Sequence, residues 1–220
     1  MKPLPLTFYS RPTLEVARDL LGCELWVNHG STALGGKLVE VEAYIGEEDP
    51  SCHAHRGRTR RTETMYGPPG MAFVYFTYGH HWMLNFVTER RGFPAAVLIR
   101  GIEPLSGIAT MRRRRMVPRD YDLSNGPGKL TQAFGITGRD NGADLRGPRL
   151  VITRGSSEPR EPITTSGRIG VGEGHERPWR FFYEYNPWVS KFRFGTKSYL
   201  KSLGPNGPTK LSSTPSGALP

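Results

Sequence analysis

Hydrophobic and polar side chains alternate along residues 38–46, LVEVEAYIG, with the period of two that is typical of a β-strand. The odd-numbered positions are all apolar, so we expect that face of the strand to be buried. The other face carries Glu40, Glu42 and Tyr44. The segment is therefore predicted to hold two carboxylates and a tyrosine side by side, opposite a buried surface.

The same periodicities predict the other regular elements of the chain. A helix is expected within residues 11–22, where apolar side chains recur at helical spacing between a proline and a glycine. A second helix is expected over residues 103–116, with Leu105 on its inner side, and a short third helix follows the glycine-rich turn within residues 125–136. Strands are expected at residues 23–27, 35–46, 95–104 and 149–153, on both sides of a turn at 78–80, and between residues 168 and 185.

These elements indicate an α+β protein, a single domain with a mixed, largely antiparallel curved sheet, peripheral helices and long loops. The 27 Gly and 19 Pro residues favour short elements joined by turns. A proline-rich arm is expected over residues 1–12, and a long functional loop over 47–70. The domain is expected to span residues 1–195, because residues 196–220 are rich in Ser, Thr, Gly, Pro and Lys and predict a disordered tail.

The charge of the chain points to an anionic partner. Thirty Lys and Arg against twenty Asp and Glu give a formal net charge of +10, which attracts polyanions such as nucleic acid. A soluble cationic protein without such a partner is the plain alternative. No run approaches the roughly 18 apolar residues of a membrane helix, so no membrane association is expected.

Cys23 and Cys52 form neither a C-x-x-C pair nor a disulfide framework, so we expect two reduced thiols. The N-terminal segment lacks the apolar region of a signal peptide. The protein is therefore expected in a reducing compartment, the cytoplasm (nucleoid) of a bacterium or the nucleus of a eukaryote.

Glu42 is the first candidate catalytic residue. A strand glutamate commonly faces solvent, but Glu42 has a buried opposite face, a tyrosine beside it and a basic loop directly after its strand. Partial desolvation by Tyr44 suits a general base. Glu40 lies one pleat further from the loop, and we expect it to be structural or a salt-bridge partner.

The aromatic stretch at residues 74–86, VYFTYGHHWMLNF, is the second candidate. We expect Phe76 and Trp82 to pack in the core. Tyr78, however, lies beside the Gly79 turn, where a large ring is hard to bury in its own protein. It is well placed to insert into a base stack.

Three basic clusters could contact phosphates, although each alone could be solvated surface. They comprise His55, Arg56, Arg58, Arg60 and Arg61 on the long loop, Arg112 to Arg115, and Lys129. The GPGK sequence around Lys129 lacks Walker A spacing. Glu40, Glu42, His53 and His55 form only a weak metal-binding pattern, so we expect no metal and no other cofactor.

Together these segments resemble the alkyladenine (3-methyladenine) DNA glycosylase family found in animals and many bacteria. The matching segments cover roughly residues 5–195 in the order of the family: VEVEAY, a histidine eleven residues after Glu42, VYFTYGHHWMLNF, AVLIRGIEPL, NGPGKLTQAFGI, RIGVG and NPWVS. The resemblance implies a monofunctional base-excision repair enzyme, acting as a monomer on double-stranded DNA that contains damaged purines. It would flip an alkylated or deaminated purine out of the duplex and hydrolyse its N-glycosidic bond, leaving an abasic site without lyase activity.

The resemblance also implies roles for individual residues. Glu42 would activate the water, with Arg100 and the backbone carbonyl of Val171 helping to position it. Tyr44 and His53 would stack on one face of the flipped base and Tyr75 on the other. Asn85 would disfavour the exocyclic amino group of guanine.

On the DNA side, Tyr78 would enter the minor groove. His80 stands where the family often has an apolar side chain, so a contact with the opposite strand is an alternative there. The expected phosphate contacts are Arg58, Arg60, Arg112 and Lys129.

Two other functions fit the residues alone. A non-catalytic, basic DNA- or RNA-binding protein would lose no activity on DNA upon Glu42→Gln. A metal-dependent hydrolase using Glu42 and His53 would lose its activity in EDTA.

Overall fold

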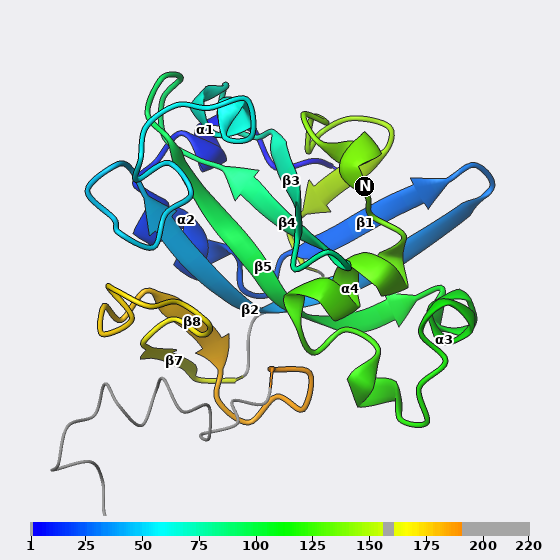
Figure 1. Cartoon of the computed structure of the whole chain (residues 1–220). Helices are drawn as coiled ribbons and strands as arrows, with labels where there is room; N and C mark the ends of the chain where they lie inside the picture. The colour runs from blue at the N-terminus through cyan, green and yellow to red at the C-terminus, as the bar shows by residue number, and fades with distance from the viewer. Residues whose placement is uncertain (1, 156–160, 191–220) are drawn as a thin grey trace, which may run out of the picture. The chain divides into compact units, whose positions relative to one another are not determined.

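The computed structural model describes residues 2–155 and 161–190, and the predicted tail, residues 196–220, lies outside them. Figure 1 shows the strands forming one sheet with helices around it. The strands are β1 (Glu24–His29), β2 (Thr32–Ile45), β3 (Ala72–Thr77), β4 (His81–Val87), β5 (Ala95–Ser106), β6 (Leu150–Thr153), β7 (Ile163–Ser166) and β8 (Arg180–Tyr183). The helices are α1 (Leu6–Tyr9), α2 (Thr13–Leu20), α3 (Ile108–Arg115) and α4 (Pro127–Phe134), with 3₁₀ turns η1 (Glu63–Tyr66), η2 (Asp120–Asp122) and η3 (Gly138–Asp140).

The sheet runs in the order β3-β4-β5-β2-β1-β6. Strand β8 also pairs with β2, beyond the residues of β2 that pair with β1. Every strand pair among the described residues is antiparallel. The register between β2 and β5 shifts at Leu38/Glu40 and Glu40/Val41, and such irregularities bend a sheet. The predicted α+β domain with a curved, largely antiparallel sheet is confirmed.

The central strands are buried on both faces. Val39, Val41 and Ala43 are fully buried, as the alternation predicts, but Glu40 and Glu42 on the other face are 0% exposed as well. Helix α2 packs against β2 and β5, and α4 packs against β4 and β5. The polar face of β2 therefore lies inside the protein.

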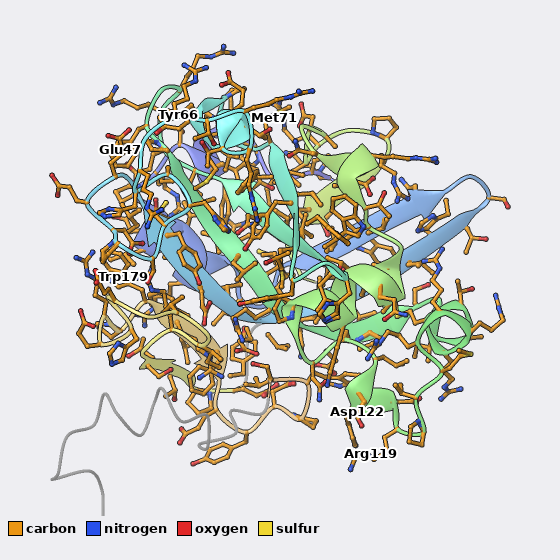
Figure 2. All side chains as sticks on the ribbon, in the orientation of Figure 1. Glu47, Tyr66, Met71, Arg119, Asp122 and Trp179 are labelled. Carbon is orange, nitrogen blue, oxygen red and sulfur yellow. The ribbon has the colours of Figure 1, made fainter. Side chains whose placement is uncertain are left out.

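The long loop of residues 47–70 is held to the sheet by a second apolar cluster. Cys52, Ala54, Met65 and Tyr66 of the loop pack with Phe73 and with residues at the ends of β4 and β5. Figure 2 labels Tyr66 at this end of the sheet, on the side of Glu47. Both cysteines are free thiols, as predicted, and both are buried.

Four details of the sequence prediction are wrong. Residues 103–106 extend β5, because backbone pairing with Gly35–Lys37 of β2 continues to Ser106, and helix α3 begins only after Gly107. Leu105 is consequently 47% exposed rather than inward-facing. The proline-rich arm contains a short helix, α1, and residues 168–172 form a loop instead of a strand.

The fourth concerns Phe76, expected in the core but 43% exposed. Its ring contacts that of Trp82, centroid to centroid at 4.8 Å, near the tip of the β3–β4 hairpin. No helix among residues 2–155 and 161–190 has the length and apolar character needed to cross a membrane.

Candidate active site

A cavity of about 920 Å³ opens on one face of the sheet. Its walls come from β2, β3, β4 and β5 and from the loops around residues 50–56 and 169–173. The strands supply Tyr44, Phe73, Tyr75, Thr77, Met83, Asn85, Leu98 and Arg100. On each strand that contributes more than one of these residues, successive ones are two positions apart, which is the spacing of side chains that share one face.

Glu42 lies directly behind this cavity. Its side chain is 0% exposed, and its carboxylate accepts three hydrogen bonds. The Ile169 amide donates to Oε1 at 2.7 Å, and the Tyr44 hydroxyl donates to Oε2 at 2.9 Å. The third donor is Arg100 Nη1, at 3.2 Å from Oε2. All three donor residues line the cavity, so the carboxylate lies directly behind its wall.

Arg100 is shared by both glutamates. Its Nε donates to Glu40 Oε1 at 3.0 Å, and that oxygen also accepts from Arg180 Nε at 2.7 Å. Burial raises the pKa of Glu40, but Arg100, Arg180 and the hydrogen bonds from Ser190 together lower it below its ordinary value. The expectation that Glu40 is a salt-bridge partner is confirmed.

Aromatic rings form much of the cavity wall. The rings of His53 and Tyr75 meet edge to face at 4.3 Å, and Phe73 lies 5.2 Å from Tyr75. His53 remains open to solvent, yet desolvation by its surroundings and the nearby Arg61 lower the pKa of its imidazole. These surroundings therefore favour the neutral imidazole. Stacking of Tyr44 and His53 on one face of a flipped base, with Tyr75 on the other face, stays a prediction.

Asn85 is 4% exposed and lines the cavity, with its Nδ2 donating to the Phe73 carbonyl at 3.1 Å. That bond fixes the amide against β3. Val171 also lines the cavity, in the loop whose Ile169 amide holds Glu42.

Tyr78 lies at the mouth of the cavity, at the tip of the β3–β4 hairpin. It is 75% exposed and has a φ of +52°, which is uncommon for a residue other than glycine. His80 follows on the same turn, and its ring contacts that of His81 in a tilted arrangement, centroid to centroid at 3.9 Å. Its Nδ1 lies 2.5 Å from the Tyr78 carbonyl.

Three of the four basic side chains predicted to contact phosphates pair with acids or amides of this chain. Arg58 pairs with Glu63, Arg112 pairs with Asp120, and Lys129 Nζ donates to Asn125 at 2.7 Å. Arg60 has no ion pair within residues 2–155 and 161–190. Exposed pairs of this kind contribute little to stability, so each basic side chain can leave its partner in this chain and contact a DNA phosphate.

The structure places eight of the predicted residues at or behind this cavity: Glu42, Tyr44, His53, Tyr75, Tyr78, Asn85, Arg100 and Val171. His80, Arg58, Arg60, Arg112 and Lys129 lie outside its walls. Other residues that line it were not predicted, among them Cys52, Met65, Phe73, Met83, Leu98 and Ile169. Phe73 and Met83 lie two positions before Tyr75 and Asn85 on their strands, so the strand periodicity could have identified them. The Ile169 amide carries no side-chain signal at all.

Metal ligation is not suggested by the clustering of side chains. Among the described residues, no group of three or more His, Cys, Asp or Glu side chains has an arrangement that could hold a metal ion.

Comparison with known proteins gives consistent names. A family model described as Methylpurine-DNA glycosylase (MPG) matches residues 7–187. A relative from Carboxydothermus hydrogenoformans is 46% identical over 189 residues, covering 86% of this chain and 98% of its own. Relatives from Salinibacter ruber (45% identical; 86% and 97% covered) and Methanocella arvoryzae (46%; 87% and 97%) are similar in extent. All three carry the name "Putative 3-methyladenine DNA glycosylase".

Proposed function

The chain belongs to the methylpurine-DNA glycosylase family, and on this premise we propose that it is a monofunctional enzyme of base-excision repair. It flips an alkylated or deaminated purine out of duplex DNA and hydrolyses the N-glycosidic bond, leaving an abasic site. The observation that carries the proposal is the buried Glu42 carboxylate, held by three donors immediately behind an aromatic cavity.

The hydrogen bonding of Glu42 suits the activation of water. An ionised carboxylate offers about four acceptor sites, and three are occupied by Ile169, Tyr44 and Arg100. We assign the remaining site to the nucleophilic water, which would reach the carboxylate between the residues that separate it from the cavity. Glu42 removes a proton from that water as it attacks C1′ of the sugar, and its charge stabilises the oxocarbenium-like transition state. Arg100 and the Val171 carbonyl help to orient the water.

The cavity suits a flipped purine. Its volume of about 920 Å³ is within the usual range for sites that bind small molecules. Tyr44 and His53 stack on one face of the base and Tyr75 on the other, which requires the His53 ring to move away from Tyr75, because the two rings are in contact at 4.3 Å. These π-surfaces favour bases made cationic by alkylation. A neutral His53 leaves the cavity free of an additional positive charge. Asn85 stands at the purine edge and disfavours the exocyclic amino group of guanine.

The surface around Tyr78 suits duplex DNA. The exposed ring enters the minor groove and fills the space of the flipped nucleotide, at an unstacking cost of a few kcal/mol. His80 contacts DNA from the same turn. Arg58, Arg60, Arg112 and Lys129 neutralise phosphates, in keeping with the net charge of +10. The protein acts as a monomer on such DNA.

A lyase step is not part of the proposal. None of the described residues that line the cavity is a lysine, and a lysine amine is the usual nucleophile for a Schiff base with the sugar. The product is therefore an intact abasic strand.

A base-release assay tests the function. Duplexes with a methylated purine, hypoxanthine or ethenoadenine are incubated with the full chain, with and without EDTA, and free base and abasic sites are measured. We expect release of at least one lesion in EDTA, and a loss of several orders of magnitude in Glu42→Gln with affinity for abasic duplex retained. Absence of release from every lesion, full activity of Glu42→Gln, or activity abolished by EDTA would each overturn the proposal.

A further inference from the structure

An ion pair between Arg168 and Asp49 lies behind the cavity, and the reaction described above does not use it. Both side chains are 0% exposed. The pair is bidentate, with Arg168 Nη1 at 2.6 Å from Asp49 Oδ2 and Nη2 at 2.7 Å from Oδ1. Neither residue is among those lining the cavity.

Both partners also bind the backbone of the segments around them. Asp49 accepts from the amides of Ile45 and Ser51, each at 3.2 Å. Arg168 donates to the carbonyls of Ala43 at 3.0 Å and Gly174 at 3.1 Å. The pair thus joins the end of β2, the start of the 47–70 loop and the loop of residues 168–174, and each of these three segments supplies residues to the cavity wall.

The Arg168 guanidinium also lies against two aromatic rings. Its carbon is 4.7 Å from the centroid of Tyr44 and 5.0 Å from that of Trp179. Figure 2 labels Trp179 near β8, at the left of the view and below Glu47. Because Tyr44 lines the cavity and Arg168 does not, the guanidinium supports the ring from behind.

The position of Arg168 in the chain adds a second connection. The next residue, Ile169, donates its amide to Glu42 Oε1 at 2.7 Å. Two of the three donors to Glu42, the Ile169 amide and the Tyr44 hydroxyl, therefore depend on where Arg168 is held. A buried ion pair is by itself weak evidence that it stabilises the fold. Its connection to Glu42, through the Ile169 amide and the Tyr44 hydroxyl, points instead to a role in the reaction.

We propose that Arg168, held by Asp49, is a positioning residue that orients Glu42 through the Ile169 amide and the Tyr44 ring. The inference rests on the proposed function. Loss of this arrangement slows hydrolysis of the glycosidic bond and leaves binding to DNA intact, because Arg168 contacts neither the base nor the expected DNA surface.

Arg168→Lys and Asp49→Asn in the full chain test the proposal. The first keeps a positive charge but loses the bidentate geometry, and the second keeps the shape of the side chain. Arg177→Lys is the matched control, because Arg177 stacks on the same Trp179 ring at 4.7 Å without contacting Asp49 or Tyr44. The readouts are single-turnover base release at saturating enzyme, affinity for abasic duplex and thermal midpoint.

We expect both variants to release base about 10- to 100-fold more slowly, as displacement of a catalytic group by about 1 Å does. Affinity for abasic duplex should change less than threefold, and Arg177→Lys should match the wild type in both measurements. If Arg168→Lys does not fold, Asp49→Asn alone decides.

Normal release by folded variants would overturn the inference, and so would a parallel loss of abasic-duplex affinity. Both outcomes leave the proposed function standing if the wild type releases base. A wild type inactive on every lesion would instead remove the function on which the inference rests.

Discussion

The Tyr44 hydroxyl donates to Glu42 Oε2 at 2.9 Å, across two positions of the same strand. The ring of Tyr44 is a wall of the cavity, while its hydroxyl holds the carboxylate behind that wall. Burial raises the pKa of Tyr44, and the adjacent Glu42 raises it further, so the phenol keeps its proton and remains a donor.

Tyr44→Phe separates these two roles. The ring stays, but Glu42 loses one donor, and a hydrogen bond to a charged group contributes about 1.5–3 kcal/mol. We therefore expect base release to slow by about tenfold or more, with lesion affinity little changed. Tyr66→Phe is the matched control, because the Tyr66 hydroxyl donates to the Glu47 carboxylate at 2.8 Å and Tyr66 does not line the cavity. Equal rates in the two variants would contradict a catalytic part for the Tyr44 hydroxyl.

Glu40→Gln is expected to destabilise the protein, because it leaves Arg180 buried without a carboxylate and Arg100 with Glu42 alone. Removal of one partner of a buried pair costs about 3–5 kcal/mol. The pKa of Glu40 is lower in the folded protein than its ordinary value of 4.5, so the folded state binds fewer protons at this group. Its contribution is complete above about pH 4.5 and is lost as the pH falls through the lowered folded-state value.

Denaturant unfolding of both proteins between pH 7 and pH 3 measures this effect. The difference in unfolding free energy between wild type and Glu40→Gln should narrow as the pH falls. A difference that stays constant over this range would show that Glu40 has the same pKa in the folded and the unfolded protein, which would contradict its lowering by the buried arginines.

His53 should titrate below its ordinary pKa of 6.5, mainly because its surroundings desolvate it and secondarily because of the positive charge of Arg61. Arg61→Gln removes the second cause only, so the midpoint should rise without reaching 6.5. Histidine NMR titration of the full chain measures the midpoints. Arg60→Gln is the control, a neighbouring exposed arginine that should leave the His53 midpoint where it is. A midpoint above 6.5 in the wild type would contradict the environment described for this imidazole.

Tyr78→Ser should weaken capture of lesion-containing duplex and leave the thermal midpoint unchanged. The ring is 75% exposed, so the fold gains little from it, whereas aromatic stacking on a base is worth about 1–3 kcal/mol. Tyr185→Ser is a suitable control, because Tyr185 is 77% exposed and does not line the cavity. Affinity for the lesion duplex, measured at fixed salt, should separate the two variants. Equal affinities would contradict the insertion of Tyr78 into DNA.

Local pattern was sufficient for much of the fold and the site. The period of two along residues 38–46 placed Glu42 and Tyr44 on one face of a strand, and the turn at Gly79 exposed Tyr78. Such features depend on neighbours a few positions apart, whose relative directions the backbone geometry sets. The same reasoning failed at residues 103–106, where pairing with β2 overrode a helical pattern.

The sequence by itself determined the central strands, the hairpin that carries Tyr78, and the pairing of Glu42 with Tyr44, because each follows from the spacing of adjacent side chains. Only the tertiary structure decided that the Ile169 amide, 127 residues along the chain, holds Glu42, and that Asp49 and Arg168, 119 residues apart, meet behind Tyr44. An amide is present in almost every residue and a single Asp or Arg has no periodicity, so such contacts leave no local pattern. They arise when chain closure brings distant loops to the same buried carboxylates, where every charge needs a partner.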